Sequence, residues 1–219
     1  MIKVLFENHH LYYLPNFIPV INEMRERDKY EIIASISNVA NKEEKEIFIE
    51  ACKQLNIKTI TEKTESERIL KIKEYGFEVV VVGNVGQLNK IADNTDMITV
   101  MIYHGIGLKQ SYYNDIDPRI DLRSVESESR MEELKSYGHD NLVLTGFTKC
   151  DPLTNQNHKK FNSFNIDQNL KTILYAPSFY PSSINKLSQF FSELSCETNL
   201  IIKLHNFSWF QDKYKYQSK

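Results

Sequence analysis

Short runs of β-branched and aromatic residues alternate with longer segments in which apolar residues recur every three or four positions. The short runs predict seven strands: Ile2–Phe6, Glu31–Ile36, Lys58–Thr61, Val79–Val82, Met97–Tyr103, Leu122–Val125 and Leu142–Leu144. The longer segments predict amphipathic helices: Leu14–Arg27, Glu43–Leu55 and Glu65–Tyr75. This alternation predicts an α/β fold with a Rossmann-like, doubly wound parallel sheet.

The pattern changes after residue 150. Residues 151–169 are polar and rich in Asn and Gln, which predicts a linker. A strand, a helix and a strand are predicted beyond it: Thr172–Tyr175, Ile184–Leu194 and Leu200–Leu204. One such unit cannot bury both of its faces, so either the second domain is incomplete, which we favour, or the unit packs onto the first sheet. The predicted organisation is a Rossmann-like domain over 1–150, a linker over 151–169 and the start of a second Rossmann-like domain over 170–219.

Composition indicates an ordinary globular protein, with 41% hydrophobic and 26% charged residues. The formal net charge of −2 gives no general attraction for nucleic acid, so any anion-binding surface must be local. No run approaches the ~20 apolar residues that span a bilayer. The N-terminal sequence MIKVLFENHH enters a strand and does not resemble a signal peptide. The three cysteines show no metal or redox spacing, so we predict a cytoplasmic protein without a metal site or cofactor.

The most informative local sequence is H-G-I-G-L-K, which follows the predicted strand Met97–Tyr103. Ligands of doubly wound sheets bind at the carboxyl ends of the strands. Gly105 and Gly107 would let backbone N–H groups approach a phosphate, and Lys109 would add a positive charge. His104 is suited to general acid or base catalysis. The alternative is a glycine-rich turn without chemistry, because the spacing lacks the third glycine of a dinucleotide fingerprint.

Histidines follow two other predicted strands. Lys203 and His205 lie two residues apart, so they would share one face at the end of their strand, either in a cleft or facing water. His9 and His10 follow the first strand. Adjacent residues in an extended segment point apart, which argues against joint metal chelation. One of this pair, His10 in our assignment, would line the crevice.

Four short motifs occur in a familiar order: HGIGLK at 104, LTGFTKCDPL at 144, ILYAPSFYP at 173 and IIKLHNF at 201. Together they resemble the CDP-glycerol glycerophosphotransferases, which prime and polymerise wall teichoic acid. The resemblance implies a GT-B fold, in which two Rossmann-like domains face one another. It implies that His104 is the base for the acceptor hydroxyl and that His205 binds the donor. To these we add Gly105, Gly107, Lys109 and His10 as phosphate- and acceptor-binding residues, and Ser178 and Lys203 as donor-binding residues.

The same resemblance implies a function. Glycerol phosphate would pass from CDP-glycerol to a lipid-linked or polymer acceptor, with release of CMP and peripheral contact with the inner membrane face. With its donor domain incomplete, the chain alone is expected to be a poor catalyst. Two alternatives remain open. One is a GT-B glycosyltransferase that uses a nucleotide sugar for capsule or lipopolysaccharide assembly, and the other is a non-catalytic Rossmann-like module that binds a phosphorylated ligand.

Overall fold

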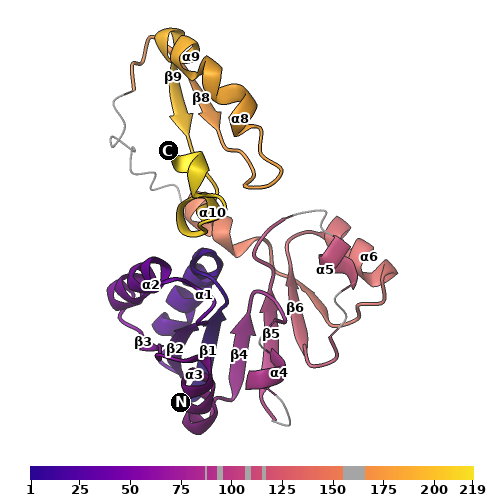
Figure 1. The fold of residues 1–219 in the computed structure, drawn as a ribbon. Coiled ribbons are helices and arrows are strands. Elements are labelled where there is room, and N and C mark those ends of the chain that lie inside the picture. Colours follow the sequence, from indigo (N-terminus) through magenta and orange to yellow (C-terminus); the bar gives the residue numbers. More distant parts are fainter. Residues whose placement is uncertain (87, 93–95, 107–109, 115–116, 155–165) are drawn as a thin grey trace. The chain divides into compact units, whose positions relative to one another are not determined.

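The computed structural model describes residues 1–86, 88–92, 96–106, 110–114, 117–154 and 166–219 (Figure 1). The chain divides into two compact units. Unit 1 comprises Met1–Gln156 and unit 2 comprises Asn157–Lys219. Each unit has its own parallel sheet.

Within the described residues, unit 1 contains a seven-stranded parallel sheet. Its strands are β1 (Ile2–Asn8), β2 (Tyr30–Ile36), β3 (Lys58–Ile60), β4 (Val79–Val82), β5 (Ile98–Ile102), β6 (Leu122–Val125) and β7 (Leu142–Leu144). Their order is β3-β2-β1-β4-β5-β6-β7. The chain therefore winds outward from β1 to β3, returns to β4 on the other side of β1, and winds outward again to β7. This order confirms the predicted Rossmann-like, doubly wound sheet.

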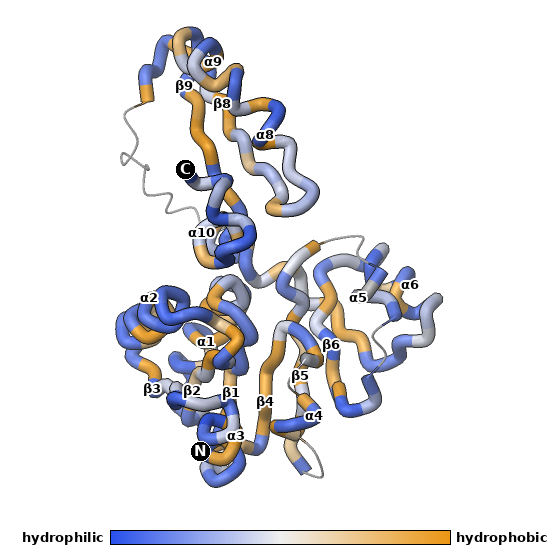
Figure 2. Tube along the Cα trace, in the orientation of Figure 1, coloured by the Kyte–Doolittle hydropathy of each residue, from blue (hydrophilic) through white to orange (hydrophobic). Residues whose placement is uncertain are grey.

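Helices cover both faces of this sheet. They are α1 (Leu14–Glu26), α2 (Lys42–Gln54), α3 (Glu65–Tyr75), α4 (Leu88–Ile91), α5 (Gln110–Asn114), α6 (Glu128–Ser136) and α7 (Asp151–Thr154), with single 3₁₀ turns η1 (Leu11–Tyr13) and η2 (Thr148–Cys150). One hydrophobic core lies under α1 and α2, and the other lies under α3, α4, α5 and α6. Figure 2 shows β4 as a run of mostly hydrophobic residues in the middle of the sheet. In the part of the chain that the structure describes, no helix has the length and apolar character needed to cross a membrane.

Two helices begin with the same capping motif. Asn41 caps α2 and Thr64 caps α3, and in each case the residue three positions later is a glutamate that reaches back to the cap. This reciprocal box satisfies backbone N–H groups that would otherwise lack partners at a helix start. Helix α3 ends at Gly76, whose φ of +70° fits the left-handed conformation that favours glycine. Local sequence thus fixes where these helices start and stop.

Unit 2 is built on two parallel strands, β8 (Lys171–Tyr175) and β9 (Thr198–Ile202). The helical segments of this unit are α8 (Ile184–Leu187), η3 (Ser188–Phe190), α9 (Phe191–Glu197), α10 (Asn206–Phe210) and η4 (Lys215–Ser218). The helical segment predicted near Ile184–Leu194 corresponds to α8, η3 and α9, and it extends to Glu197. The last strand was also predicted two residues too late. Lys203 and His205 therefore follow β9 and do not extend it.

Candidate functional site

The sheet of unit 1 has one topological switch point, between β1 and β4, within the described residues. The connections on its two sides run in opposite directions, and doubly wound folds bind their ligands at such a point, beyond the carboxyl ends of the strands. Residues from the ends of β1, β4 and β5 meet there. The rings of His10, Tyr12, Tyr13, His104 and Tyr112 form a connected set, which we call the switch-point cluster.

Two hydrogen bonds fix the orientation of His104 after β5. Its Nδ1 lies 3.0 Å from the carbonyl oxygen of Gly83, and its Nε2 lies 2.9 Å from the hydroxyl of Tyr112. A carbonyl only accepts hydrogen bonds, so Nδ1–H donates to Gly83, and in the neutral ring Nε2 then accepts from Tyr112. Burial raises the pKa of Tyr112 to about 12, which keeps its phenol protonated and able to donate at neutral pH. In this arrangement His104 is the neutral Nδ1–H tautomer.

Tyr13 packs at the centre of the cluster. Its ring centroid lies 4.6 Å from that of His104 and 4.5 Å from that of Tyr12. Its hydroxyl accepts hydrogen bonds from Asn84 Nδ2 at 2.8 Å and from Tyr12 Oη at 3.3 Å. A Cβ atom on Gly83 would come within 2.0 Å of the Tyr13 ring. The glycine after β4 is therefore required by close packing of an aromatic ring.

His10, which was predicted to line the crevice, lies at the carboxyl end of β1. The residue is 6% exposed. Its ring stacks on Tyr12, with the centroids 5.6 Å apart and the planes inclined by 17°. Its Nδ1 lies 3.4 Å from Oε1 of Glu44, which is the capping glutamate of α2. The structure therefore brings His10 and His104 into one cluster through the ring of Tyr12.

A buried arginine lies beside the other end of the cluster. The Arg130 guanidinium is 4.1 Å from the ring centroid of Tyr113 and 5.9 Å from that of Tyr112. Its nitrogens lie 3.9 Å from Glu126 and 3.6 Å from Glu133. The region therefore combines imidazoles, phenols and a guanidinium in largely buried surroundings. Imidazoles and phenols hydrogen-bond hydroxyls and exchange protons, and a guanidinium hydrogen-bonds phosphates.

A second polar network lies where β1 and β2 meet α3. Arg68 is 0% exposed, and its Nη1 donates to Glu7 Oε2 at 2.7 Å. Ser35 Oγ donates to the same carboxylate oxygen. Burial raises the pKa of Glu7 despite the opposing influence of Arg68. Arg68 also donates to Glu65 at 2.6 Å, so one buried guanidinium joins β1, β2 and α3.

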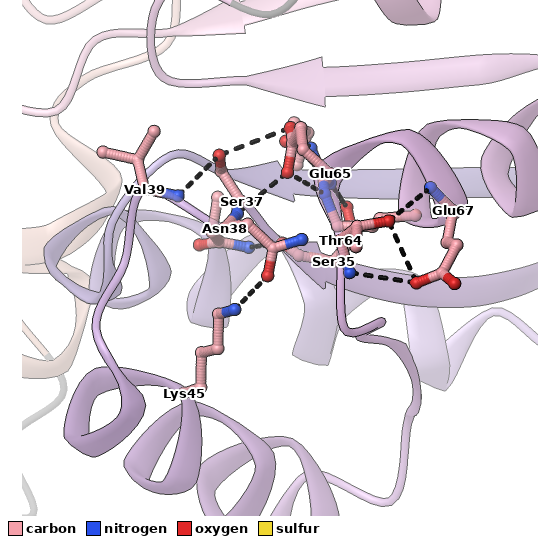
Figure 3. Close-up of polar contacts among 11 residues, drawn as sticks. Ser35, Ser37, Asn38, Val39, Lys45, Thr64, Glu65 and Glu67 are labelled. Carbon is pink, nitrogen blue, oxygen red and sulfur yellow. Dashed lines mark hydrogen bonds and ion pairs between the residues drawn. The ribbon is translucent and has the colours of Figure 1, made fainter.

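The loop after β2 is held between two helices (Figure 3). Glu65 of α3 accepts from the backbone N–H of Asn38 at 2.9 Å and from Ser37 Oγ at 3.4 Å. Lys45 of α2 donates to the side-chain oxygen of Asn38. Figure 3 also shows the separate box of Thr64 and Glu67 at the start of α3. These contacts fix the start of α2, and with it the carboxylate that faces His10.

The structure gives less information about the other residues that were predicted to act in the 104–109 loop. Gly105 is described, and a Cβ there would lie 3.6 Å from Tyr112 Oη, which is ordinary contact. Packing therefore does not require glycine at this position. Gly107 and Lys109 lie outside the described residues. Among the residues that are described, no group of three or more His, Cys, Asp or Glu side chains could hold a metal ion.

The predicted donor-binding residues lie in unit 2. His205 is the N-cap of α10, and its Nδ1 accepts from the backbone N–H of Phe207 at 3.1 Å. Its ring packs 4.6 Å from that of Phe179. Ser178 is exposed, and its hydroxyl donates to the carbonyl of Tyr180 at 3.3 Å. Lys203 is exposed just after β9. These residues all come from loops that follow β8 and β9.

Several residues of the cluster were not predicted from the sequence. Tyr12, Tyr13 and Tyr112 carry no local signal, because aromatic residues at these spacings are usually core residues. Glu44 does carry a signal, since Asn41 followed three residues later by glutamate is a capping box. That motif indicates a helix start, but nothing local indicates that the carboxylate also meets an imidazole.

No family model matches the chain, and no curated protein matches it. Solved structures do resemble it. The S. aureus MnaA–UDP complex has a TM-score of 0.68 at 14% identity, over 100% of this chain and 65% of that one. A UDP-GlcNAc 2-epimerase from Methanocaldococcus jannaschii has a TM-score of 0.59 at 14% identity, over 99% of this chain and 67% of that one.

The same M. jannaschii enzyme in complex with UDP-GlcNAc and UDP has a TM-score of 0.55 at 14% identity, over 99% of this chain and 67% of that one. At such low identity the likeness shows the fold, an α/β arrangement consistent with the N-terminal domain of a GT-B protein. The chain spans 65% of the length of the S. aureus protein.

These neighbours correct the family inferred from the sequence. The fold neighbours are UDP-GlcNAc 2-epimerases and a UDP complex, so the assignment as a CDP-glycerol glycerophosphotransferase is wrong. The predictions that depended on this family are therefore wrong as well: CDP-glycerol as donor, a teichoic-acid acceptor and glycerophosphotransferase activity. The reason lies in where the four motifs fall. The first follows β5, and the other three begin inside β7, β8 and β9 and continue into the turns that a fold of this type places at its strand ends. Their order therefore reports the fold and carries no information about the donor.

Proposed function

We propose that this protein acts as an enzyme that binds a UDP-sugar and transfers a proton from and to the sugar. UDP-GlcNAc is the first substrate to test. One observation carries the proposal. The switch-point cluster places two histidines and three tyrosines at the ligand-binding edge of the sheet, in a fold whose neighbours include UDP and UDP-GlcNAc complexes. The activity of the whole protein is part of the proposal, because the chain spans 65% of the S. aureus neighbour.

The groups in the cluster suit this chemistry. Epimerisation inverts one carbon, so a C–H bond must break and re-form, and side chains must accept and return the proton. Imidazoles and phenols exchange protons, and in a largely buried site water competes weakly for them. The glycosyltransferase alternative also uses a nucleotide sugar, but it needs a second substrate whose hydroxyl attacks the sugar.

Binding is the first test. Calorimetric titration of the chain with UDP-GlcNAc, UDP and CDP-glycerol should show binding of the two uridine compounds and weaker or no binding of CDP-glycerol. Tyr13→Ala removes a central ring of the cluster and should weaken UDP-GlcNAc binding, while the exposed Arg27→Met should leave binding unchanged. Failure of both uridine compounds to bind the wild-type chain would refute the proposed ligand.

The reaction type is tested in D₂O. Epimerisation places deuterium on the inverted carbon of UDP-GlcNAc, which proton NMR detects as loss of one sugar resonance. Glycosyl transfer instead releases UDP and leaves the sugar carbons unlabelled. Deuterium incorporation supports the proton-transfer reaction, and release of UDP to an added acceptor without incorporation supports the glycosyltransferase alternative.

Roles in unit 2 and in the 104–109 loop are part of the same proposal. Lys203, His205 and Ser178 follow the strands of unit 2 and stay proposed donor-binding residues. Gly105, Gly107 and Lys109 would contact the sugar or its phosphate. The cytoplasmic location stays a prediction, and so does the peripheral membrane contact.

A further inference from the structure

The contact between His10 and Glu44 has the form of a carboxylate–imidazole pair. Nδ1 of His10 lies 3.4 Å from Oε1 of Glu44. His10 is 6% exposed and Glu44 is 1% exposed. A carboxylate so deeply buried is unfavourable unless hydrogen bonds or an opposite charge compensate it. The position of Glu44 therefore needs an explanation.

Helix capping explains only part of this position. Glu44 Oε2 accepts from the backbone N–H of Asn41 at 3.3 Å, which completes the capping box. Its other oxygen, Oε1, accepts from the N–H of Leu11 at 3.3 Å and faces His10. Both oxygens are thus held by backbone groups, one from α2 and one from the turn after β1. Rigid support of this kind fixes the direction in which the carboxylate meets the imidazole.

The second capping box provides an internal comparison. Glu67, at the matching position of α3, accepts from the N–H and the hydroxyl of Thr64 and is exposed. It meets no histidine ring among the described contacts. A capping glutamate therefore does not need burial to serve its helix. The burial of Glu44 and its contact with His10 are additional to the capping role.

The two histidines of the cluster have different polar groups next to their ring nitrogens. His104 donates to a carbonyl and accepts from a phenol, and this arrangement favours the neutral ring. His10 faces a carboxylate, which stabilises the imidazolium formed when the ring takes up a proton. The ring of Tyr12 contacts both histidines, at 5.6 Å and 5.4 Å between centroids. Both therefore belong to one site but are suited to different tasks.

We propose that His10 is the proton-transferring residue of the switch-point cluster, with Glu44 as its positioning residue and His104 as a neutral structural and binding group. This inference rests on the proposed UDP-sugar function. In the proposed step, an O–H or C–H bond of the sugar breaks and its electron pair stays on the substrate atom. The proton moves to Nε2 of His10, while the Nδ1–H donates to the Glu44 carboxylate.

The pairing is tested without any ligand. Ring-nitrogen NMR of the ¹⁵N-histidine-labelled chain should show neutral His10 with its hydrogen on Nδ1. Glu44→Gln replaces the carboxylate with an amide that can present either an oxygen or an NH₂ group, so the fixed tautomer should be lost. Glu67→Gln is the matched control, because it alters the other capping box and should leave the His10 signals unchanged.

The catalytic role is tested with UDP-GlcNAc. His10→Gln should lower deuterium incorporation or UDP release by about 100-fold or more, while the dissociation constant for UDP changes less than about threefold. Glu44→Gln should lower turnover by at least about tenfold without a matching change in KM. Glu67→Gln should turn over at the wild-type rate. Denaturant midpoints of the three variants show whether each one is folded.

Three results would overturn the inference. The first is a His10 hydrogen on Nε2 in the wild-type chain, and the second is a Glu44→Gln rate no lower than that of Glu67→Gln. The third is a His10→Gln variant that converts UDP-GlcNAc at the wild-type rate. If UDP-GlcNAc and UDP do not bind at all, the proposed function fails. The tautomer measurement still decides whether the carboxylate–imidazole pair exists.

Discussion

Arg68→Met is expected to destabilise unit 1 by about 3–5 kcal/mol, the range for removing one partner of a buried ion pair. Arg68 is 0% exposed, and it donates to Glu7 at 2.7 Å and to Glu65 at 2.6 Å. Methionine replaces much of the apolar stem, so most of the loss comes from charge left without a partner. Glu7 dominates because its side chain is 4% exposed, whereas that of Glu65 is 24% exposed and can be rehydrated.

The electrostatic part of this loss of stability can be measured separately from the loss of packing. Burial holds the pKa of Glu7 above its ordinary value even beside Arg68. Glu7→Gln combined with Arg68→Met removes the charge that the single variant leaves unpaired. The double variant should therefore be less destabilised than the sum of the two single variants, by about 1–3 kcal/mol of coupling energy. A double variant as unstable as the sum of the two single changes would refute the electrostatic reasoning.

Urea denaturation provides the assay. With a slope of about 2 kcal/mol/M, Arg68→Met should lower the midpoint of unit 1 by about 1.5–2.5 M. Far-UV circular dichroism follows mainly unit 1, whereas the fluorescence of Trp209, the single tryptophan of the chain, reports unit 2. The Trp209 transition should stay in place. Arg27→Met disrupts a fully exposed pair with Glu23 and serves as a control that should change neither transition.

Three further predictions follow from the cluster and its supports. Gly83→Ala should destabilise unit 1 by about 1–3 kcal/mol, measured by urea denaturation, because the new Cβ would overlap the Tyr13 ring. Tyr112→Phe should remove the hydrogen bond to His104 at a cost of about 1 kcal/mol and should shift the His104 Nε2 signal in ring-nitrogen NMR. Burial opposes ionisation of Glu44, but hydrogen bonds from His10 and the backbone outweigh it and lower the pKa of Glu44. The ionised Glu44 carboxylate therefore stabilises the folded state at pH values above 4.5, its ordinary pKa. This stabilisation is lost as the pH falls through the lower pKa of Glu44 in the folded state. In Glu44→Gln, denaturation measured from about pH 7 to about pH 3 should show a shallower loss of stability below about pH 4.5.

Strands and long helices could be predicted because a local pattern in the sequence determines each of them. The runs Val79–Val82 and Leu122–Val125 were predicted with their observed bounds, and so was the helix Glu65–Tyr75. Their periodicity and their caps lie within a few residues of sequence. The end of β9 was not predictable in this way. The apolar run continues to Leu204, but the strand ends at Ile202 and His205 caps a short helix.

The candidate site was predictable only in part. His10 and His104 were identified because both follow predicted strands, and strand ends gather in a parallel sheet. Their partners were not identified, because Glu44 and Tyr112 approach them only after α2 and α5 have packed. The misassigned family has a related cause. Short strand-end motifs reflect what the fold requires, so they do not distinguish one nucleotide-linked substrate from another.

The strand order of unit 1 has a consequence for synthesis on the ribosome. Every strand of its sheet lies between Ile2 and Leu144, and β1, the first to be made, pairs with both β2 and β4. The complete sheet is therefore available before β8 and β9 have been translated, and domains generally fold as units in order of synthesis. Unit 1 can therefore reach its native packing while unit 2, with exposed apolar residues such as Leu174, is still being translated.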